Sequence, residues 1–167
     1  RSGAGDFIVL VSHGGATDAT DYLSGLNTTA AIYDGATTWN DTEPTATVFS
    51  VGTNDDVNDS GDDYIAYCFH SVDGYSKVGS YTGNGDVDGT FVYTGFRPAY
   101  VLIKCSNNAS YGYWFIFDSV RQTYNVIGDV ALTADNGWEE GLGGNWNPNT
   151  SDVALDFVSN GFKLRTT

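Results

Sequence analysis

The chain has few of the residues that nucleic-acid binding, disulfide frameworks and membrane spans require. Its 167 residues include 7 Lys plus Arg, 3 Pro, 2 Cys and no Met. So few basic residues argue strongly against nucleic-acid binding, because phosphate contact needs clustered Lys and Arg. No apolar run approaches the roughly 18 residues of a membrane-spanning helix. The sequence therefore predicts neither a nucleic-acid-binding protein nor one inserted in a membrane.

The two cysteines are too few for a disulfide framework. Cys68 and Cys105 either form a single bridge or stay free. Cys68 lies in the apolar run 64–69, and free cysteines are among the most buried residue types. The sequence favours a buried free thiol at this position.

Glutamate is also scarce, with Glu43, Glu139 and Glu140 as its only members. A retaining glycosidase needs two carboxyl groups about 5 Å apart, and the adjacent pair in a Gly-rich loop does not predict such convergence. The two histidines, His13 and His70, have no spacing that suggests a triad or a zinc site. We therefore expect a protein without enzymatic activity and assign no catalytic residue.

Acidic residues are abundant: 21 Asp plus Glu give a formal net charge of −14. Two interpretations stay open. An acidic surface keeps a protein soluble, particularly in salty surroundings where repulsion is screened. Alternatively, some carboxylates bind a divalent cation.

Glycine and aromatic residues dominate the rest, with 21 Gly, 11 Tyr and 9 Phe. This mixture favours short strands joined by tight turns, and no stretch of ten residues has a helical period. We expect an all-β, jelly-roll-like antiparallel β-sandwich with few or no helices. The predicted strands are 7–11, 30–32, 47–51, 64–72, 75–81, 91–94, 99–104, 113–118, 130–132, 153–158 and 162–165.

The chain repeats itself internally. Trp39-Asn40 returns as Trp146-Asn147, an offset of 107 residues, and the apolar run 7–10 returns as 114–117 at the same offset. A repeated unit of this size indicates an array or an internally duplicated domain.

The chain begins within one copy of the repeat and ends within the next. Residues 1–60 form the end of a first copy and 61–167 most of a second, and together we expect them to form one compact sandwich region. The phase predicts a fragment of a longer polypeptide that continues at both ends.

Several motifs, in order and spacing, resemble an uncharacterised domain that recurs in tail-fibre and virion appendage proteins of marine bacteriophages. These motifs are YIAYCF at 64–69, GYSKVGSYTGNG at 74–85, DGTFVYTGFRPA at 88–99, VLIK at 101–104 and LDFVSNGFKLR at 155–165. The resemblance implies a concanavalin A-like jelly roll and a virion or extracellular location.

The same resemblance implies a structural and adhesive role, with glycan or host-receptor binding by surface loops. The expected partners are further copies of the chain, other virion subunits and a cell-surface glycan. One alternative is a purely structural assembly module of a multimeric virion or surface filament. A second alternative is a carbohydrate-active enzyme.

Aromatic residues beside polar loops are the candidate ligand contacts. Trp138, Tyr111 and Tyr113 lie in or next to Gly/Asn-rich segments, where a flat ring beside amides and carboxylates suits sugar recognition. Trp39 and Trp146 occupy equivalent positions in the repeat, which predicts a structural role in the core for both.

Two loops place side-chain oxygens at alternate positions before a glycine, as calcium loops do. The candidate ligands are Asp56, Asn58 and Ser60 in one loop and Asn84, Asp86 and Asp88 in the other. Neither loop has an acid at its twelfth position, and Asx-rich turns produce the same pattern. The sequence requires no cofactor, and Ca²⁺ is the one that it suggests.

Overall fold

The computed structural model describes residues 7–10, 22–110, 112–121, 123–125, 131–135 and 154–165. The chain folds into two compact units. Unit 1 comprises Arg1–Phe69 with Cys105–Tyr113, and unit 2 comprises His70–Lys104 with Trp114–Thr167. The division after Phe69 lies near the boundary between copies that the repeat predicts.

Unit 1 contains a small antiparallel sheet and two single-turn helices. In chain order its elements are β1 (Ile8–Leu10), β2 (Tyr22–Gly25), β3 (Tyr33–Asp34), α1 (Ala36–Trp39) and α2 (Asp55–Asn58). The strands pair in the order β1-β2-β3. Asn40 ends α1 in the left-handed region at φ 58°, and the Asn54 side chain caps α2 by accepting a hydrogen bond from the Asp56 amide.

The described core of unit 1 is centred on α1. Thr38 and Trp39 are buried, and the indole packs edge-on against Phe49 with 6.4 Å between ring centroids. Gly52 lies so close to α1 that a Cβ there would be 2.0 Å from the Thr37 carbonyl oxygen. The predicted core role of Trp39 is therefore confirmed, whereas Trp146 lies outside the described residues.

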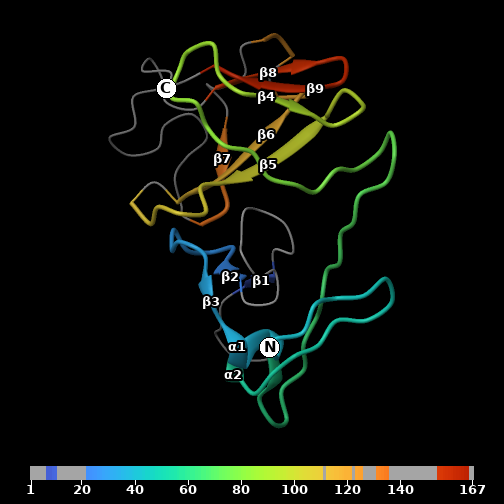
Figure 1. Ribbon diagram of the computed structural model, residues 1–167, viewed down its shortest axis with the longest axis vertical. Coiled ribbons are helices and arrows are strands. Elements are labelled where there is room, and N and C mark those ends of the chain that lie inside the picture. The colour runs from blue at the N-terminus through green and yellow to red at the C-terminus, as the bar shows by residue number, and fades with distance from the viewer. Residues whose placement is uncertain are drawn as a thin grey trace. The chain divides into compact units, whose positions relative to one another are not determined.

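Unit 2 contains two three-stranded antiparallel sheets. Its elements are β4 (Phe91–Tyr93), β5 (Tyr100–Lys104), β6 (Trp114–Asp118), β7 (Leu132–Thr133), β8 (Leu155–Val158) and β9 (Gly161–Leu164). The sheets have the orders β4-β9-β8 and β5-β6-β7, and Figure 1 shows them as separate layers of the unit. The expected all-β antiparallel architecture, with very few helical residues, is confirmed.

Each sheet of unit 2 turns one face of its strands into the core. Val101 pairs with Phe117 across β5 and β6, and Phe157 pairs with Phe162 across β8 and β9; all four side chains are buried. Because successive side chains of a strand alternate between faces, this pairing collects the large apolar side chains between the layers.

The opposite faces of the two sheets differ in chemistry. On the β5-β6-β7 sheet, Leu102 pairs with Ile116 and Ile116 with Leu132, so the middle of this outer face is apolar and partly exposed. Lys104 and Asp118 lie at its two ends. On the β4-β9-β8 sheet, Asp156 pairs with Lys163. Only the first sheet is therefore apolar on both sides of its middle, as the hydrophobic runs in β5 and β6 predict.

Four predicted strands, 30–32, 47–51, 64–72 and 75–81, do not form; β3 begins directly after the first of these ranges. A turn at Asp73-Gly74 separates the last two of these ranges, and an isolated bridge between Val72 and Ser76 closes it. A strand needs a neighbour for its backbone groups, so β-forming composition alone does not create one. The prediction that the Cys68 thiol is buried was wrong for the same reason, because Cys68 is exposed, whereas the prediction that it is free is confirmed. Cys105 is also free.

The repeat is visible in the strands. The hairpin β1–β2 pairs Ile8 with Gly25, and the hairpin β6–β7 pairs Phe115 with Thr133. These pairs are separated by 107 and 108 residues in the sequence. Both units therefore contain the same hairpin, with a register shift of one residue.

Candidate functional site

The candidate site begins with the β8–β9 hairpin, whose sequence alternates apolar and charged residues. Leu155 and Phe157 turn into the core, which places Asp156 on the opposite face of the strand. Lys163 lies directly across from Asp156 in the ladder, and Arg165 follows two residues later on the same side. The alternation gives the sheet one outer face with fixed charges, called the charged face below.

Strand β4 adds two aromatic rings to the charged face. Phe91 pairs with Lys163 and Tyr93 pairs with Gly161, so both rings share the face of the charges. Phe91 is 45% and Tyr93 65% exposed. A Cβ on Gly161 would lie 3.0 Å from the Phe91 ring and 2.1 Å from the Val92 carbonyl oxygen, so glycine allows this close approach of β4.

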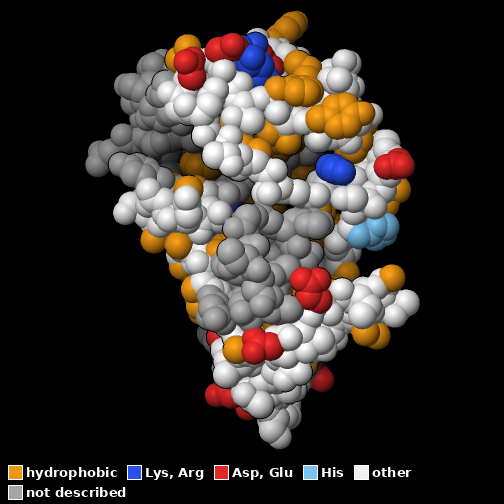
Figure 2. Space-filling model, in the orientation of Figure 1, with side chains coloured by type: hydrophobic (Ala, Val, Ile, Leu, Met, Phe, Trp, Pro, Cys, Tyr) orange, Lys and Arg blue, Asp and Glu red, His pale blue; other side chains and the backbone are white. Residues whose placement is uncertain are grey.

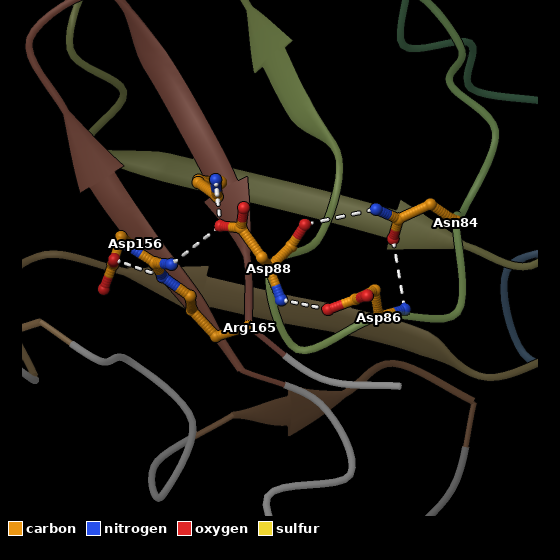
Figure 3. A network of polar contacts seen from close by, with 6 residues as sticks. Asn84, Asp86, Asp88, Asp156 and Arg165 are labelled. Carbon is orange, nitrogen blue, oxygen red and sulfur yellow. Dashed lines mark hydrogen bonds and ion pairs between the residues drawn. The ribbon is translucent and has the colours of Figure 1, made fainter.

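A network of charges connects the strands to the loop before β4 (Figure 3). The Lys163 ammonium lies 2.5 Å from the Asp88 carboxylate, and the Arg165 guanidinium lies 3.6 Å from the same oxygen. Arg165 also donates a hydrogen bond through Nε to Asp156 at 2.6 Å. Figure 2 shows acidic, basic and hydrophobic side chains gathered over the part of the molecule that carries β4, β8 and β9.

The protonation states of the network follow from these contacts. The hydrogen bond from Lys163, followed by its charge, lowers the pKa of Asp88 below the ordinary aspartate value, and Arg165 adds to the effect. Asp156 is buried, and its Oδ1 has no hydrogen-bond partner within the described part of the chain. Asp88 is therefore ionised at neutral pH. In this state its carboxylate can accept hydrogen bonds but has no proton to donate as a general acid.

The loop predicted as a calcium site at Asn84, Asp86 and Asp88 belongs to this network. The Asn84 side-chain oxygen accepts from the Asp86 amide at 3.3 Å, and Asp86 accepts from the Asp88 amide at 2.8 Å. Gly85 takes a left-handed φ of 67°. The structure does bring these residues together, but through Asx turns and an ion pair to Lys163, so calcium binding here stays a prediction.

The other predicted calcium residues lie on and after α2. Asp56 and Asn58 are two positions apart on a helical turn, so their side chains point to different sides. The Asn58 amide donates to the Gly52 carbonyl at 2.7 Å, and Ser60 is exposed beyond the helix. In the described ranges no group of three or more His, Cys, Asp or Glu side chains is arranged to hold a metal ion.

An open polar depression of about 550 Å³ lies beside α2 in unit 1. Its lining consists of Thr37, Thr53, Asn54, Asp55 and Asp56. The hydroxyl, amide and carboxylate groups there suit small polar ligands. An aromatic ring, which a sugar-binding site typically adds to such groups, is missing from this lining.

Of the three predicted ligand-binding aromatics, the structure describes Tyr113 alone. Tyr111 and Trp138 lie outside the described residues, and Tyr113 is half-buried next to β6. The buried ring beside it is Trp114, which stacks with the Lys104 ammonium 5.3 Å from its centroid. The candidate site therefore rests on rings that were not predicted as ligand contacts.

Comparison with known families gives one match. A family model described as a domain of unknown function, DUF7483, covers residues 2–167. The chain belongs to the DUF7483 family. No curated protein and no solved structure matches it. In the part of this DUF7483 domain that the structure describes, no helix is long and apolar enough to cross a membrane.

Sequence reasoning missed the charged face of the DUF7483 domain, although part of the signal is readable. Asp156, Lys163 and Arg165 stand at alternate positions of an otherwise apolar hairpin, which marks them as neighbours on one side. The pairing of Phe91 with Lys163 joins segments 72 residues apart. No local pattern predicts that contact.

Proposed function

We propose that this DUF7483 domain is a non-catalytic adhesion module, displayed on a virion appendage or a comparable extracellular surface, that binds a glycan on the charged face. The observation that carries the proposal is the position of Phe91 and Tyr93. Both rings are exposed on the face of β4 that also carries the Asp88–Lys163 ion pair.

This arrangement fits the chemistry of a sugar. One face of a pyranose ring is apolar and stacks on an aromatic side chain, while its hydroxyl groups need donors and acceptors close by. Tyr93 and Phe91 offer the stacking surface. The Asp88 carboxylate, whose side chain is 77% exposed, offers an acceptor, and Lys163 offers a donor.

The charges on this face favour binding over hydrolysis. Glycoside hydrolysis needs a carboxylic acid whose pKa is raised so that it can donate a proton. The pKa of Asp88 is instead lowered by Lys163, and Asp156 is engaged by Arg165. Both carboxylates are therefore placed as fixed acceptors.

A single site on an open sheet face binds weakly, and repetition on a multimer would raise the avidity. The test is therefore a glycan array probed with the domain displayed on a multivalent scaffold. Positive glycans are then measured by calorimetry with Tyr93→Ala and Phe91→Ala. We expect each substitution to weaken binding by about tenfold, the loss of one stacked ring.

Tyr124→Ala is the matched control, because Tyr124 is also a highly exposed tyrosine of unit 2 and lies outside β4. It should leave the affinity unchanged. An array without any positive glycan, or equal losses from Tyr93→Ala and Tyr124→Ala, would rule out glycan binding at the charged face.

A further inference from the structure

The segment Tyr64–Phe69 has the composition of a central strand, but it is not paired with a neighbouring strand in the part of the chain that the structure describes. All six residues are apolar or aromatic, without the alternation of a strand that has one solvated face. In the structure the segment is not part of any sheet (Figure 1). Ile65 is 80% and Phe69 84% exposed, and Tyr67 is similarly open.

The backbone of this segment is also unsatisfied. Residues 65–69 make no hydrogen bond to any described residue. Only the start of the segment is anchored: the Tyr64 hydroxyl donates to the Asp55 carbonyl at 2.7 Å and accepts from the Asp59 amide at 2.8 Å. An extended apolar segment with free backbone groups is a template for pairing with another strand.

Unit 2 offers a matching free edge on β5. The Ala99 carbonyl accepts a hydrogen bond from the Ser119 amide, so the backbone groups at every second residue from Ala99 face β6. The N–H and C=O groups of Tyr100 and Leu102 consequently point away from β6. They have no partner among the residues that the structure describes.

The other long edge strands of unit 2 fit the segment less well. On β8, the Asn125 side chain bonds both the Phe157 amide and the Phe157 carbonyl at 3.1 Å, which blocks that edge. The edge of β4 has no backbone partner within the described ranges, but its sheet carries Asp156 and Lys163 on one face. A strand added there would place apolar side chains beside these charges.

The middle of the β5-β6-β7 sheet is apolar on both faces, while Lys104 and Asp118 lie at the two ends of its outer face. An apolar segment can therefore add beside the middle of β5. Val101 is buried on the inner face, and Leu102 and Ile116 pair on the outer one. We propose that Tyr64–Phe69 of one copy of this chain adds as a strand to the free edge of β5 in a second copy.

The proposal is independent of glycan binding, so a negative glycan array leaves it in place. Segment and edge are different surfaces, so the contact is heterologous and either closes reciprocally in a dimer or extends into a chain of copies. Each copy carries a net charge of −14. Salt should therefore strengthen the association by screening the repulsion.

The first test is sedimentation of the full 167-residue chain over a wide concentration range at low and high salt. We expect reversible association that strengthens with salt. The double substitution Ile65→Lys/Phe69→Lys should weaken it by about tenfold or more, because the charges would enter an apolar interface. Val120→Lys is the control, since Val120 is as exposed as Ile65. A chain that stays monomeric overturns the proposal.

The second test identifies the edge and the copy by disulfide trapping. Protein with Cys105→Ser, which keeps Cys68 as its only thiol, is mixed with protein carrying Cys68→Ser/Cys105→Ser/Leu102→Cys and oxidised mildly. We expect a disulfide between the two proteins. Trapping with Phe91→Cys in place of Leu102→Cys would assign the edge to β4 and overturn the choice of β5.

A third protein distinguishes pairing within one chain from pairing between two copies. It carries Cys105→Ser/Leu102→Cys and therefore has both thiols of the proposed contact. An intermolecular product supports the second copy as the partner. A monomeric product with an internal disulfide, formed at every protein concentration, would overturn it. Residues 65–69 are exposed, so substitutions there should leave the chain folded.

Discussion

The two units of this molecule contain the same hairpin in different surroundings. In unit 2, β6 has β5 on one side and β7 on the other, and most of its residues are buried. In unit 1, β2 is the one described strand that pairs with β1, and the three residues of β1 are only half-buried. The difference shows that burial is supplied by neighbouring strands and a facing sheet, and that the apolar sequence of the hairpin only permits it.

A second contrast makes the same point. The run Tyr64–Phe69 is as apolar as β5, yet β5 is paired along its length with β6 and the run is unpaired. Strand propensity depends on packing against neighbours. The run would therefore form a strand only beside a neighbouring strand. We propose that β5 of a second copy supplies this neighbour, since the outward backbone groups of Tyr100 and Leu102 have no partner in the part of the chain that the structure describes.

The largest expected effect comes from truncating equivalent core positions of the two hairpins. Phe117→Ala removes a side chain that is 0% exposed and should lower the free energy of unfolding of unit 2 by about 3–5 kcal/mol. Leu10→Ala, 107 residues earlier, removes a half-buried side chain and should cost unit 1 about 1–2 kcal/mol.

Chemical denaturation monitored by hydrogen exchange in each hairpin measures both effects. The comparison between units would fail if Leu10→Ala cost as much as Phe117→Ala, because β1 would then be as well packed as β6.

A smaller effect is expected from a pair of glycines in unit 2. Gly161→Ala places a Cβ 2.1 Å from the Val92 carbonyl oxygen and should destabilise the unit by about 1–3 kcal/mol, as overpacking does. Gly79→Ala meets no atom within 4 Å and should change stability by less than about 0.5 kcal/mol. Equal melting temperatures for the two variants would show that β4 and β9 are not as closely packed as described.

The smallest effect concerns pH and the charged face. Because the pKa of Asp88 is lower in the folded than in the unfolded chain, its contribution to stability is present above the unfolded value of about 4. That contribution is lost as the pH falls through the folded value. An NMR titration of the side-chain carboxyl carbons measures the folded pKa directly.

Lys163→Met should raise the pKa of Asp88 toward the ordinary aspartate value, since the hydrogen bond from Lys163 is the main cause of the shift. Lys77→Met, which removes another exposed lysine of unit 2, should not. If the two variants shift Asp88 equally, the effect comes from net charge and the ion pair is not formed in solution.

Much of the fold could be predicted from short-range patterns. The alternation or continuity of apolar residues in 99–104, 113–118 and 153–158 predicts strands that the structure contains. The same reasoning failed for 64–72, because a strand-like sequence carries no information on whether a neighbour is available. Sequence composition also predicted exposed aromatics, but in loops.

The charged face could be predicted only in part. The alternate spacing of Asp156, Lys163 and Arg165 in one hairpin places them on one side. Their meeting with Asp88 depends on the pairing of β4 with β9, a contact between distant segments. The pattern of Asn84, Asp86 and Asp88 in the loop before β4 does not distinguish a calcium site from Asx turns, because Asx turns use the same residues for local hydrogen bonds.

The central claim is that β6 lies in a well-packed core of unit 2, and that Tyr64–Phe69 of one copy pairs as a strand with β5 of a second copy. Hydrogen–deuterium exchange of the full chain at low and high protein concentration tests it most directly. We predict slow exchange in β6 at both concentrations, faster exchange in β1, and protection of residues 65–69 and 100–102 that appears together at high concentration. Protection of 65–69 that is already complete in dilute monomer, or absent at every concentration, would contradict the account.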